Sequence, residues 1–313
     1  MHHLRIGGID LEISPPPGQA LVEENGIYAE FWDHDGGGCD VHLSASVRPA
    51  GPLPFPVSAS VPVCGAWRYW SDGRSRAALF MAGGGRGERI GVILPASGQD
   101  IEVRVFPEGE RSARAAGMRN PLHFPVDMVL WSLLLPSRQG LIVHAAGWSA
   151  GGGALVLAAP GGGGKSTLAG LLRSEIGGRI LSDDRLILRM TPAGLWAWGT
   201  PWAGDRGLAG NHCAPVREIL FMRKDRCNRI STMTASQVVE GLLKVSTIPW
   251  YDQELSSQSL RLMEEITRVA VCRTLGFVAD ESAAVFIAGR MSGKSRSGFR
   301  GPGPSRKARR ARD

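Results

Sequence analysis

The sequence predicts an α/β fold with an α+β tendency and mixed sheets, preceded by a β-rich N-terminal region. Two observations support this prediction. An apolar strand at residues 154–157 runs into a glycine-rich loop, and leucines at helical spacing follow that loop. A second apolar strand at residues 141–149 comes directly before it, and the three glycines between them favour an antiparallel hairpin beside the loop.

Charge and composition divide the 313 residues into three regions. Residues 290–313 hold nine of the 36 Lys and Arg residues and one acid, so the rest of the chain is close to neutral despite a net charge of +7. Glycine, serine, proline and arginine dominate this end, which cannot bury enough apolar area to fold. We predict a β-rich region at 1–118, a second domain at 119–289 and a disordered basic tail at 290–313, whose nucleic-acid contacts would be unspecific.

Cysteine usage and hydropathy indicate a cytoplasmic protein without membrane contact. The five cysteines are odd in number and none are spaced C-x-x-C, so neither a disulfide framework nor a zinc site is indicated. The first residues lack the apolar segment of a secretory signal. The longest apolar run, residues 126–135, contains Asp127 and is too short to span a bilayer.

Alternating apolar residues predict N-terminal strands at 9–13, 27–32, 41–47 and 101–106, separated by glycine and proline clusters. Residues 121–137 then predict a helix, which we expect to pack beneath the sheet that carries the glycine-rich loop.

Beyond the loop and its helix, further strands are predicted at 179–182, 185–190, 195–198 and 217–222. The later part of the chain is predicted to be helical. Thr234 and Gln237 have the spacing of a capping box, and Asp252 is placed to cap a longer amphipathic helix.

The glycine-rich loop has the form of a phosphate-binding loop, with Ala159 where the first glycine usually stands and Lys165-Ser166 at its end. Strand, loop and helix occur in the order that such a loop requires. Its backbone N–H groups would face the phosphates of ATP, Lys165 would reach the outer phosphates, and the Ser166 hydroxyl would bind Mg²⁺. A glycine-rich hairpin with a chance Lys-Ser is the alternative. The predicted nucleotide-binding residues are Gly161, Gly162, Gly163, Gly164, Lys165, Ser166 and Thr167.

Two adjacent carboxylates, Asp183 and Asp184, follow Lys165 by 18 and 19 residues and end the next predicted strand. Phosphoryl transfer needs a ligand for Mg²⁺ and a base for the attacking hydroxyl, and this position suits both. We expect His144 near the Asp183 carboxylate, where the two groups would shift each other's pKa. The alternatives are a solvated Asp-Asp turn and a hydrogen-bonded core histidine.

Asp205, in a glycine- and proline-rich loop, is a further candidate ligand for magnesium, although an ordinary loop acid is nearly as good an interpretation. Three arginines are candidates to stabilise the transferred phosphoryl group, and the sequence does not choose among them: Arg206, Arg217 and Arg223.

These motifs resemble those of a known family. The order His144-Ala-Ala-Gly, phosphate-binding loop and Ser182-Asp-Asp-Arg185 is similar to the catalytic domain of bacterial HPr serine kinase/phosphorylase, which shares its nucleotide site with ATP-dependent phosphoenolpyruvate carboxykinase. A closer resemblance is to the HPr-kinase-related proteins of peptide-modification cassettes, including the SynChlorMet type. The shared segments, within roughly residues 120–288, are Gly199-Thr-Pro-Trp202, Asn211 with Ala214-Pro215, and Asp280-Glu-Ser282.

The resemblance implies a P-loop kinase domain of the HPr kinase/phosphoenolpyruvate carboxykinase type at 119–289. It implies that Lys165 and Ser166 bind phosphate and Mg²⁺, that Asp183 is the catalytic base, that Asp184 assists the metal and that His144 supports Asp183. The glycine-rich Glu-x-Arg-Gly sequence of HPr kinases is absent after the Asp pair.

The function expected is transfer of the γ-phosphoryl group of ATP to a hydroxyl, such as a serine of a small protein or ribosomally made peptide. A small-metabolite P-loop kinase is one alternative, although such folds generally begin with the phosphate-binding loop. A non-catalytic nucleotide-binding module of a modification complex is another. A homo-oligomer is left open.

Overall fold

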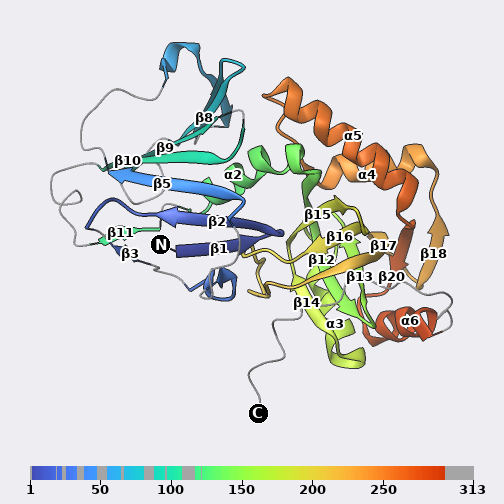
Figure 1. The fold of residues 1–313 in the computed structure, drawn as a ribbon. Coiled ribbons are helices and arrows are strands. Elements are labelled where there is room, and N and C mark those ends of the chain that lie inside the picture. Colours follow the sequence, from blue (N-terminus) through green and yellow to red (C-terminus); the bar gives the residue numbers. More distant parts are fainter. Residues whose placement is uncertain are drawn as a thin grey trace.

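The computed structural model describes residues 2–18, 20–22, 26–33, 39–47, 55–64, 67–80, 88–95, 97–107, 117–120 and 122–292. Within these ranges, two large mixed sheets and five α-helices form an α/β arrangement (Figure 1). The predicted basic tail begins inside the last helix, α6 (Glu281–Ser292), and its residues 293–313 lie outside the described ranges.

The described residues of the N-terminal region form a nine-stranded sheet in the order β4-β1-β2-β5-β10-β9-β8-β7-β6. Its strands alternate buried and half-buried residues as predicted; in β2, Ile9, Leu11 and Ile13 face the core. The strand bounds are β1 (His2–Ile6), β2 (Ile9–Ser14), β4 (Trp32–Asp33), β5 (Val41–Val47), β6 (Val61–Cys64), β7 (Trp67–Ser71), β8 (Ser75–Phe80), β9 (Glu88–Pro95) and β10 (Asp100–Pro107). A separate pair joins β3 (Ala20–Val22) to β11 (Gly117–Arg119).

The prediction of a strand at 27–32 is wrong. Its residues form a 3₁₀ turn, η1 (Ala29–Phe31), followed by the two-residue β4. Tyr28 and Phe31 are both buried, and a spacing of three places them on the same side of a 3₁₀ turn, whereas a strand would turn them to opposite faces.

The helix predicted at 121–137 is shorter than expected, and it packs against both sheets, where the prediction named the loop-bearing sheet alone. It forms α2 (Val126–Leu134), and a 3₁₀ turn, η3 (Pro136–Arg138), follows it. Its buried side chains, with Trp131 fully covered, belong to one core with the N-terminal sheet. That core also takes in Ile142 and Ile187, so the helix lies between the two sheets and not beneath the loop-bearing one alone.

The second sheet carries the glycine-rich loop. Its main path is β13-β12-β15-β16-β17-β20-β18, and a further pairing of β13 with β17 closes five strands into a ring. Because β12 is antiparallel to β13 and β17 is parallel to it, the predicted hairpin is confirmed and the sheet is mixed. The strand bounds are β12 (Gly140–Ala150), β13 (Gly153–Ala158), β14 (Arg179–Ser182), β15 (Arg185–Thr191), β16 (Gly194–Trp198), β17 (Cys213–Lys224), β18 (Arg229–Thr232), β19 (Ser246–Thr247) and β20 (Cys272–Phe277).

Helices cover this sheet on two sides (Figure 1). The helices α4 (Ala235–Val245) and α5 (Gln253–Val269) share one core with the ring, whereas α3 (Lys165–Ile176) and α6 share another core with β13, β17 and β20. Both predicted caps are confirmed: Thr234 and Gln237 form a capping box, and Asp252 accepts from the backbone N–H of Leu255. Among the described helices, none combines the length and apolarity needed to cross a membrane.

Polar contacts join the N-terminal region to the rest of the chain. The Arg189 guanidinium donates to the carbonyls of Gly7 and Gly8 at 2.8 and 2.9 Å. The cap residue Asp252 accepts from the Tyr69 hydroxyl and, at 2.8 Å, from the Arg76 guanidinium. The regions predicted at 1–118 and 119–289 therefore share a hydrophobic core and a polar interface, which hold the N-terminal sheet against the domain that carries the glycine-rich loop.

Candidate functional site

The glycine-rich loop lies at the carboxyl end of the buried strand β13, where it enters the N-terminus of α3. Strands β17 and β20 run parallel to β13, so their carboxyl ends reach the same edge. Ligands of parallel α/β sheets bind outside the carboxyl ends of the strands, and these three parallel strands place the loop there. The first turn of α3 carries Lys165, Ser166 and Thr167, so the loop ends on helical N–H groups suited to an anion.

The alanine at the first position of the loop, Ala159, restricts which residue can stand at the fifth position, Gly163. A β-carbon at Gly163 would meet the Ala159 β-carbon at 2.5 Å, so Ala159 makes glycine necessary at Gly163. Gly161 and Gly162 have open space around them. Among the described residues, the backbone N–H groups of Gly161, Gly162 and Gly164 make no bond to another backbone carbonyl, whereas that of Gly163 donates to Pro160.

Gly164 caps α3 with φ +85°, a conformation that favours glycine. A β-carbon there would also approach the ring of Phe277 to 2.4 Å, and that ring is fully buried. We expect Gly164→Ala to lower the free energy of unfolding by at least about 1–2 kcal/mol, the cost of left-handed backbone alone. Thermal denaturation of Gly164→Ala measures this loss, with Gly161→Ala as the matched control. Equal melting temperatures for the two variants would contradict this loop conformation.

The Lys165 ammonium folds back onto the loop. It donates to the carbonyls of Ala159 and Pro160 at 3.0 and 3.3 Å and lies 3.1 Å from His144 Nε2. The residue is 6% exposed, and burial lowers the pKa of its amine. A desolvated ammonium held by neutral carbonyls is a strong donor for a phosphate oxygen, which is a better acceptor because it is charged.

The structure corrects the expected partner of His144. Its Nε2 lies 2.7 Å from Asp184 Oδ1, and the other Asp184 oxygen accepts from the Arg185 guanidinium at 2.7 Å. Asp183 is hydrogen-bonded elsewhere, although its charge, like that of Asp184, acts to raise the pKa of Lys165 that burial lowers. Its fully buried carboxylate accepts the backbone N–H groups of Gly204 and Arg206 at 2.7 and 3.2 Å. His144 therefore supports Asp184, and Asp183 fixes the 204–206 loop.

Lys165, His144, Asp184 and Arg185 thus form a continuous polar chain. Neutral His144 has one proton, so its Nε2 either donates to Asp184 or accepts from Lys165. The hydrogen bond from His144 is the largest cause that holds the pKa of Asp184 below its ordinary value, and the positive charge of Arg185 adds to it. Stability from this carboxylate is therefore present above its unfolded-state pKa of about 3.9 and is lost as pH falls through the lower folded-state pKa.

The remaining sequence candidates are separated by the structure. Ser166 lies with the group, since its hydroxyl donates to the Asp183 carbonyl at 3.1 Å. Asp205 is exposed, and among the described residues no interaction joins it to Ser166 or Asp184. No role was predicted for Arg185, although its position directly after the Asp pair was a signal for one.

The three candidate arginines occupy different places. The Arg206 guanidinium lies against α3, where a β-carbon on Gly170 would meet it at 2.7 Å. Arg217 sits by the β12–β13 turn, donating to Gly151 at the end of β13 opposite the loop. Arg223 is on the loop's edge of the sheet and lies 3.7 Å from Asp225. Arg217 is therefore too far along the sheet to reach phosphates held by the loop.

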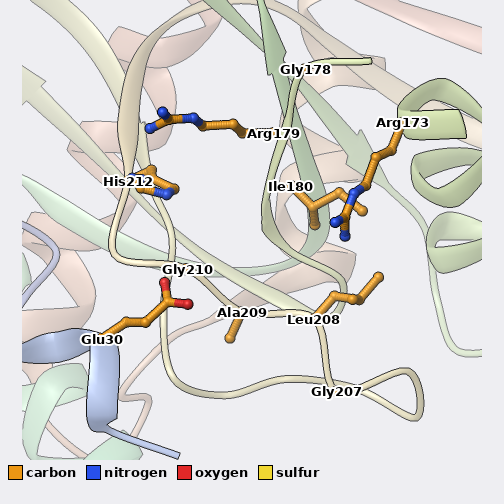
Figure 2. A pocket seen from close by; sticks show the side chains of 10 residues that line it. All are labelled: Glu30, Arg173, Gly178, Arg179, Ile180, Gly207, Leu208, Ala209, Gly210 and His212. Carbon is orange, nitrogen blue, oxygen red and sulfur yellow. The ribbon is translucent and has the colours of Figure 1, made fainter. Parts of the chain in front are cut away.

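A cleft of about 440 Å³ adjoins the loop that binds Asp183 (Figure 2). Arg173 comes from α3, Arg179 opens β14, and Glu30 reaches in from the N-terminal region. In the described part of the chain, no ion pair or side-chain hydrogen bond engages either arginine. The full lining is Glu30, Arg173, Gly178, Arg179, Ile180, Gly207, Leu208, Ala209, Gly210 and His212.

No protein-family model matches this chain, and a comparison with curated proteins finds no match either.

Proposed function

We propose that this chain is an ATP-dependent kinase that transfers the γ-phosphoryl group to a hydroxyl, namely a serine of a small protein or peptide. The observation that carries the proposal is the polar chain from Lys165 through His144 to Asp184, at the N-terminus of the helix that follows the glycine loop. A phosphate-binding lysine next to a supported carboxylate is what phosphoryl transfer to a hydroxyl requires.

The residues present fit a nucleotide and Mg²⁺. The loop N–H groups and the open space at Gly161 and Gly162 suit a triphosphate, and Lys165 would donate to its outer oxygens. The Ser166 oxygen retains lone pairs for Mg²⁺, which would neutralise charge on the phosphates. Asp205 remains a predicted additional ligand.

Asp184 is the carboxylate we assign as base. Its side chain is 21% exposed, and each oxygen keeps a second acceptor position beside its present partner. In the transfer, the acceptor oxygen bonds to the γ-phosphorus, the bond to the β,γ-bridging oxygen breaks and ADP leaves. The hydroxyl proton passes to Asp184. His144 and Arg185 orient the carboxylate and keep it ionised.

The acceptor would approach along the 204–210 loop. One end of that loop binds Asp183, and the other end lines the cleft with Arg173 and Arg179. Arg179 is in register with Ser149, which pairs with Ala154 at the end of β13 away from the glycine loop. Two arginines without anionic partners in the described residues therefore favour an acceptor whose acidic residues lie several positions from its serine. The kinase is tested by incubating it with Mg²⁺-ATP and serine peptides flanked by acidic or basic residues, and locating phosphoserine by mass spectrometry. Phosphorylation of none of them would count against the proposal.

Reversing the charge of the cleft should weaken acceptor binding selectively. We expect Arg173→Glu combined with Arg179→Glu to raise KM for an acidic serine peptide roughly 10-fold, equivalent to about 1.4 kcal/mol, with KM for ATP unchanged. The matched control is Arg217→Glu, which reverses the charge of an exposed arginine on β17 that does not line the cleft. Equal effects from the two charge reversals would remove the cleft from the acceptor site.

A further inference from the structure

A row of polar side chains crosses the N-terminal sheet on the face turned away from α2. His3 on β1 is in register with Glu12 on β2, and Glu12 is in register with His42 on β5. Side chains in register share one face, and their neighbours Leu4, Leu11 and Leu43 point the other way into the core. The row is therefore an outer-face feature that the apolar core does not explain.

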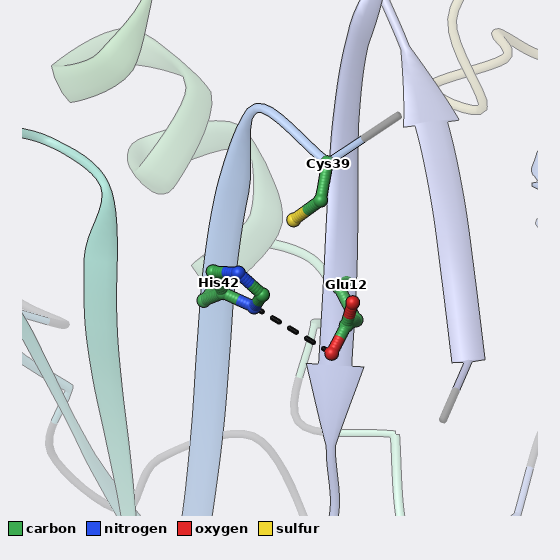
Figure 3. A group of neighbouring side chains, drawn as sticks. All are labelled: Glu12, Cys39 and His42. Carbon is green, nitrogen blue, oxygen red and sulfur yellow. Dashed lines mark ion pairs between the residues drawn. The ribbon is translucent and has the colours of Figure 1, made fainter. Parts of the chain in front are cut away.

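Cys39 joins this row from the segment that leads into β5. Its thiol, the Glu12 carboxylate and the His42 imidazole each offer a ligand atom, and these atoms lie within 4.8 Å of one another (Figure 3). The segment is fixed to β2, because Asp40 and Asp10 exchange two hydrogen bonds, from Asp40 N to Asp10 O and from Asp10 N to the Asp40 carboxylate. Cys39 is therefore held beside Glu12 by the fold.

We propose that Glu12, Cys39 and His42 bind Zn²⁺ or a similar first-row transition metal. The His42 Nδ1 and Glu12 Oε1 atoms are 3.5 Å apart, longer than an ordinary hydrogen bond. Two ligands of a tetrahedral Zn²⁺ with bonds of about 2.0–2.1 Å stand roughly 3.3–3.4 Å apart, close to this separation. Thiolate and imidazole select zinc-like metals over Mg²⁺ and Ca²⁺, which prefer oxygen.

Two further observations favour a cation here. Glu12 is only 15% exposed at its side chain, and its one recorded partner among the described residues is the distant His42 nitrogen. His3, next in the row, has a buried Nδ1 with no hydrogen-bond partner in the described part of the chain. Water in the fourth position of a three-ligand site would be a partner for such a nitrogen.

Cysteine spacing could not predict this site, because its ligands come from β2 and from residues 39–42 at the start of β5, which meet only in the fold. A metal bound here would link β2 to the start of β5, so its role would be to stabilise the N-terminal sheet. This metal site uses no residue of the kinase site, and its test is independent of that proposal.

Cobalt is the probe, because a thiolate ligand produces a charge-transfer absorption band that oxygen and nitrogen ligands do not. Titrating the full chain with Co²⁺ should give this band at one equivalent, and Zn²⁺ should displace it. Cys39→Ser should abolish the band, and His42→Gln and Glu12→Gln should each weaken binding by at least about 10- to 100-fold. These side chains are exposed or half-buried, so folding should persist in circular dichroism.

Cys213→Ser, an exposed cysteine on β17, is the matched control and should leave the band intact. Asp184→Asn should also leave it intact, which separates this site from the kinase site. Absence of the band in the wild-type protein, or its survival in Cys39→Ser, would overturn the proposal.

Discussion

Lys165→Met should weaken ATP binding roughly 10- to 100-fold while the protein stays folded. Methionine keeps the buried stem of Lys165 but cannot donate to a phosphate oxygen. Hydrogen bonds to charged groups contribute about 1.5–3 kcal/mol, which corresponds to this range of affinity. The Pro160 carbonyl is next to the exposed Gly161, whereas the bond from Lys165 to the Ala159 carbonyl is buried. Losing that one buried donor should lower the melting temperature by several degrees without unfolding the protein. Calorimetric titration with ATP and Mg²⁺ measures the affinity.

The matched control is Lys244→Met. Lys244 is exposed on α4 and is paired with Glu240, so this change removes the same charge from the protein without touching the loop. ATP affinity should be unchanged in this variant. If both lysine variants bind ATP as the wild type does, the glycine loop is not a phosphate-binding loop.

Asp184→Asn should reduce phosphoryl transfer by about 10²–10⁴, the usual range for a positioned acid–base group. Asparagine retains the size of the side chain but cannot take the hydroxyl proton. Because Lys165, Ser166 and the loop remain, affinity for Mg²⁺-ATP should stay within a few-fold of wild type. Rapid-quench kinetics at saturating ATP, with a parallel calorimetric titration, separates the two quantities.

Asp183→Asn is the informative companion, because it makes the same chemical change one residue away. An asparagine offers one oxygen, whereas two backbone N–H groups now bind the Asp183 carboxylate. Leaving one of them buried and unpaired costs about 1–3 kcal/mol, so this variant should lose stability more than it loses transfer. If Asp183→Asn abolishes transfer at full stability, the base is Asp183, as the family resemblance implies. Loss of Mg²⁺-dependent ATP affinity in Asp184→Asn would instead make Asp184 a metal ligand.

Local sequence patterns predicted much of the loop-bearing half. Strand 154–157, the glycine loop and the helix after it were recognisable because apolar period and glycine content change within a few residues. The capping box at Thr234 and the cap at Asp252 were equally local, since each depends on residues three apart. The predicted hairpin of strands 141–149 and 154–158 followed from the glycine turn between them.

Features that depend on long-range packing could not be predicted from local sequence patterns. Asp183 and Asp184 are neighbours at a strand end, and the backbone there turns one inward to Gly204 and the other outward to His144. No local pattern distinguishes the two residues. The placement of α2 against the N-terminal sheet likewise depends on contacts with residues more than a hundred positions away, such as Trp131 Nε1 to the Ile6 carbonyl.

The fate of the γ-phosphoryl group tests the kinase proposal most directly. Wild-type protein would be mixed for a single turnover with γ-labelled ATP, Mg²⁺ and an acidic serine peptide, and label would be measured in peptide and in inorganic phosphate. The account predicts that label appears on the serine hydroxyl in step with ADP, and that Asp184→Asn binds the nucleotide but delays this transfer. ADP formed without labelled peptide, or labelled ATP bound and recovered intact, would contradict it.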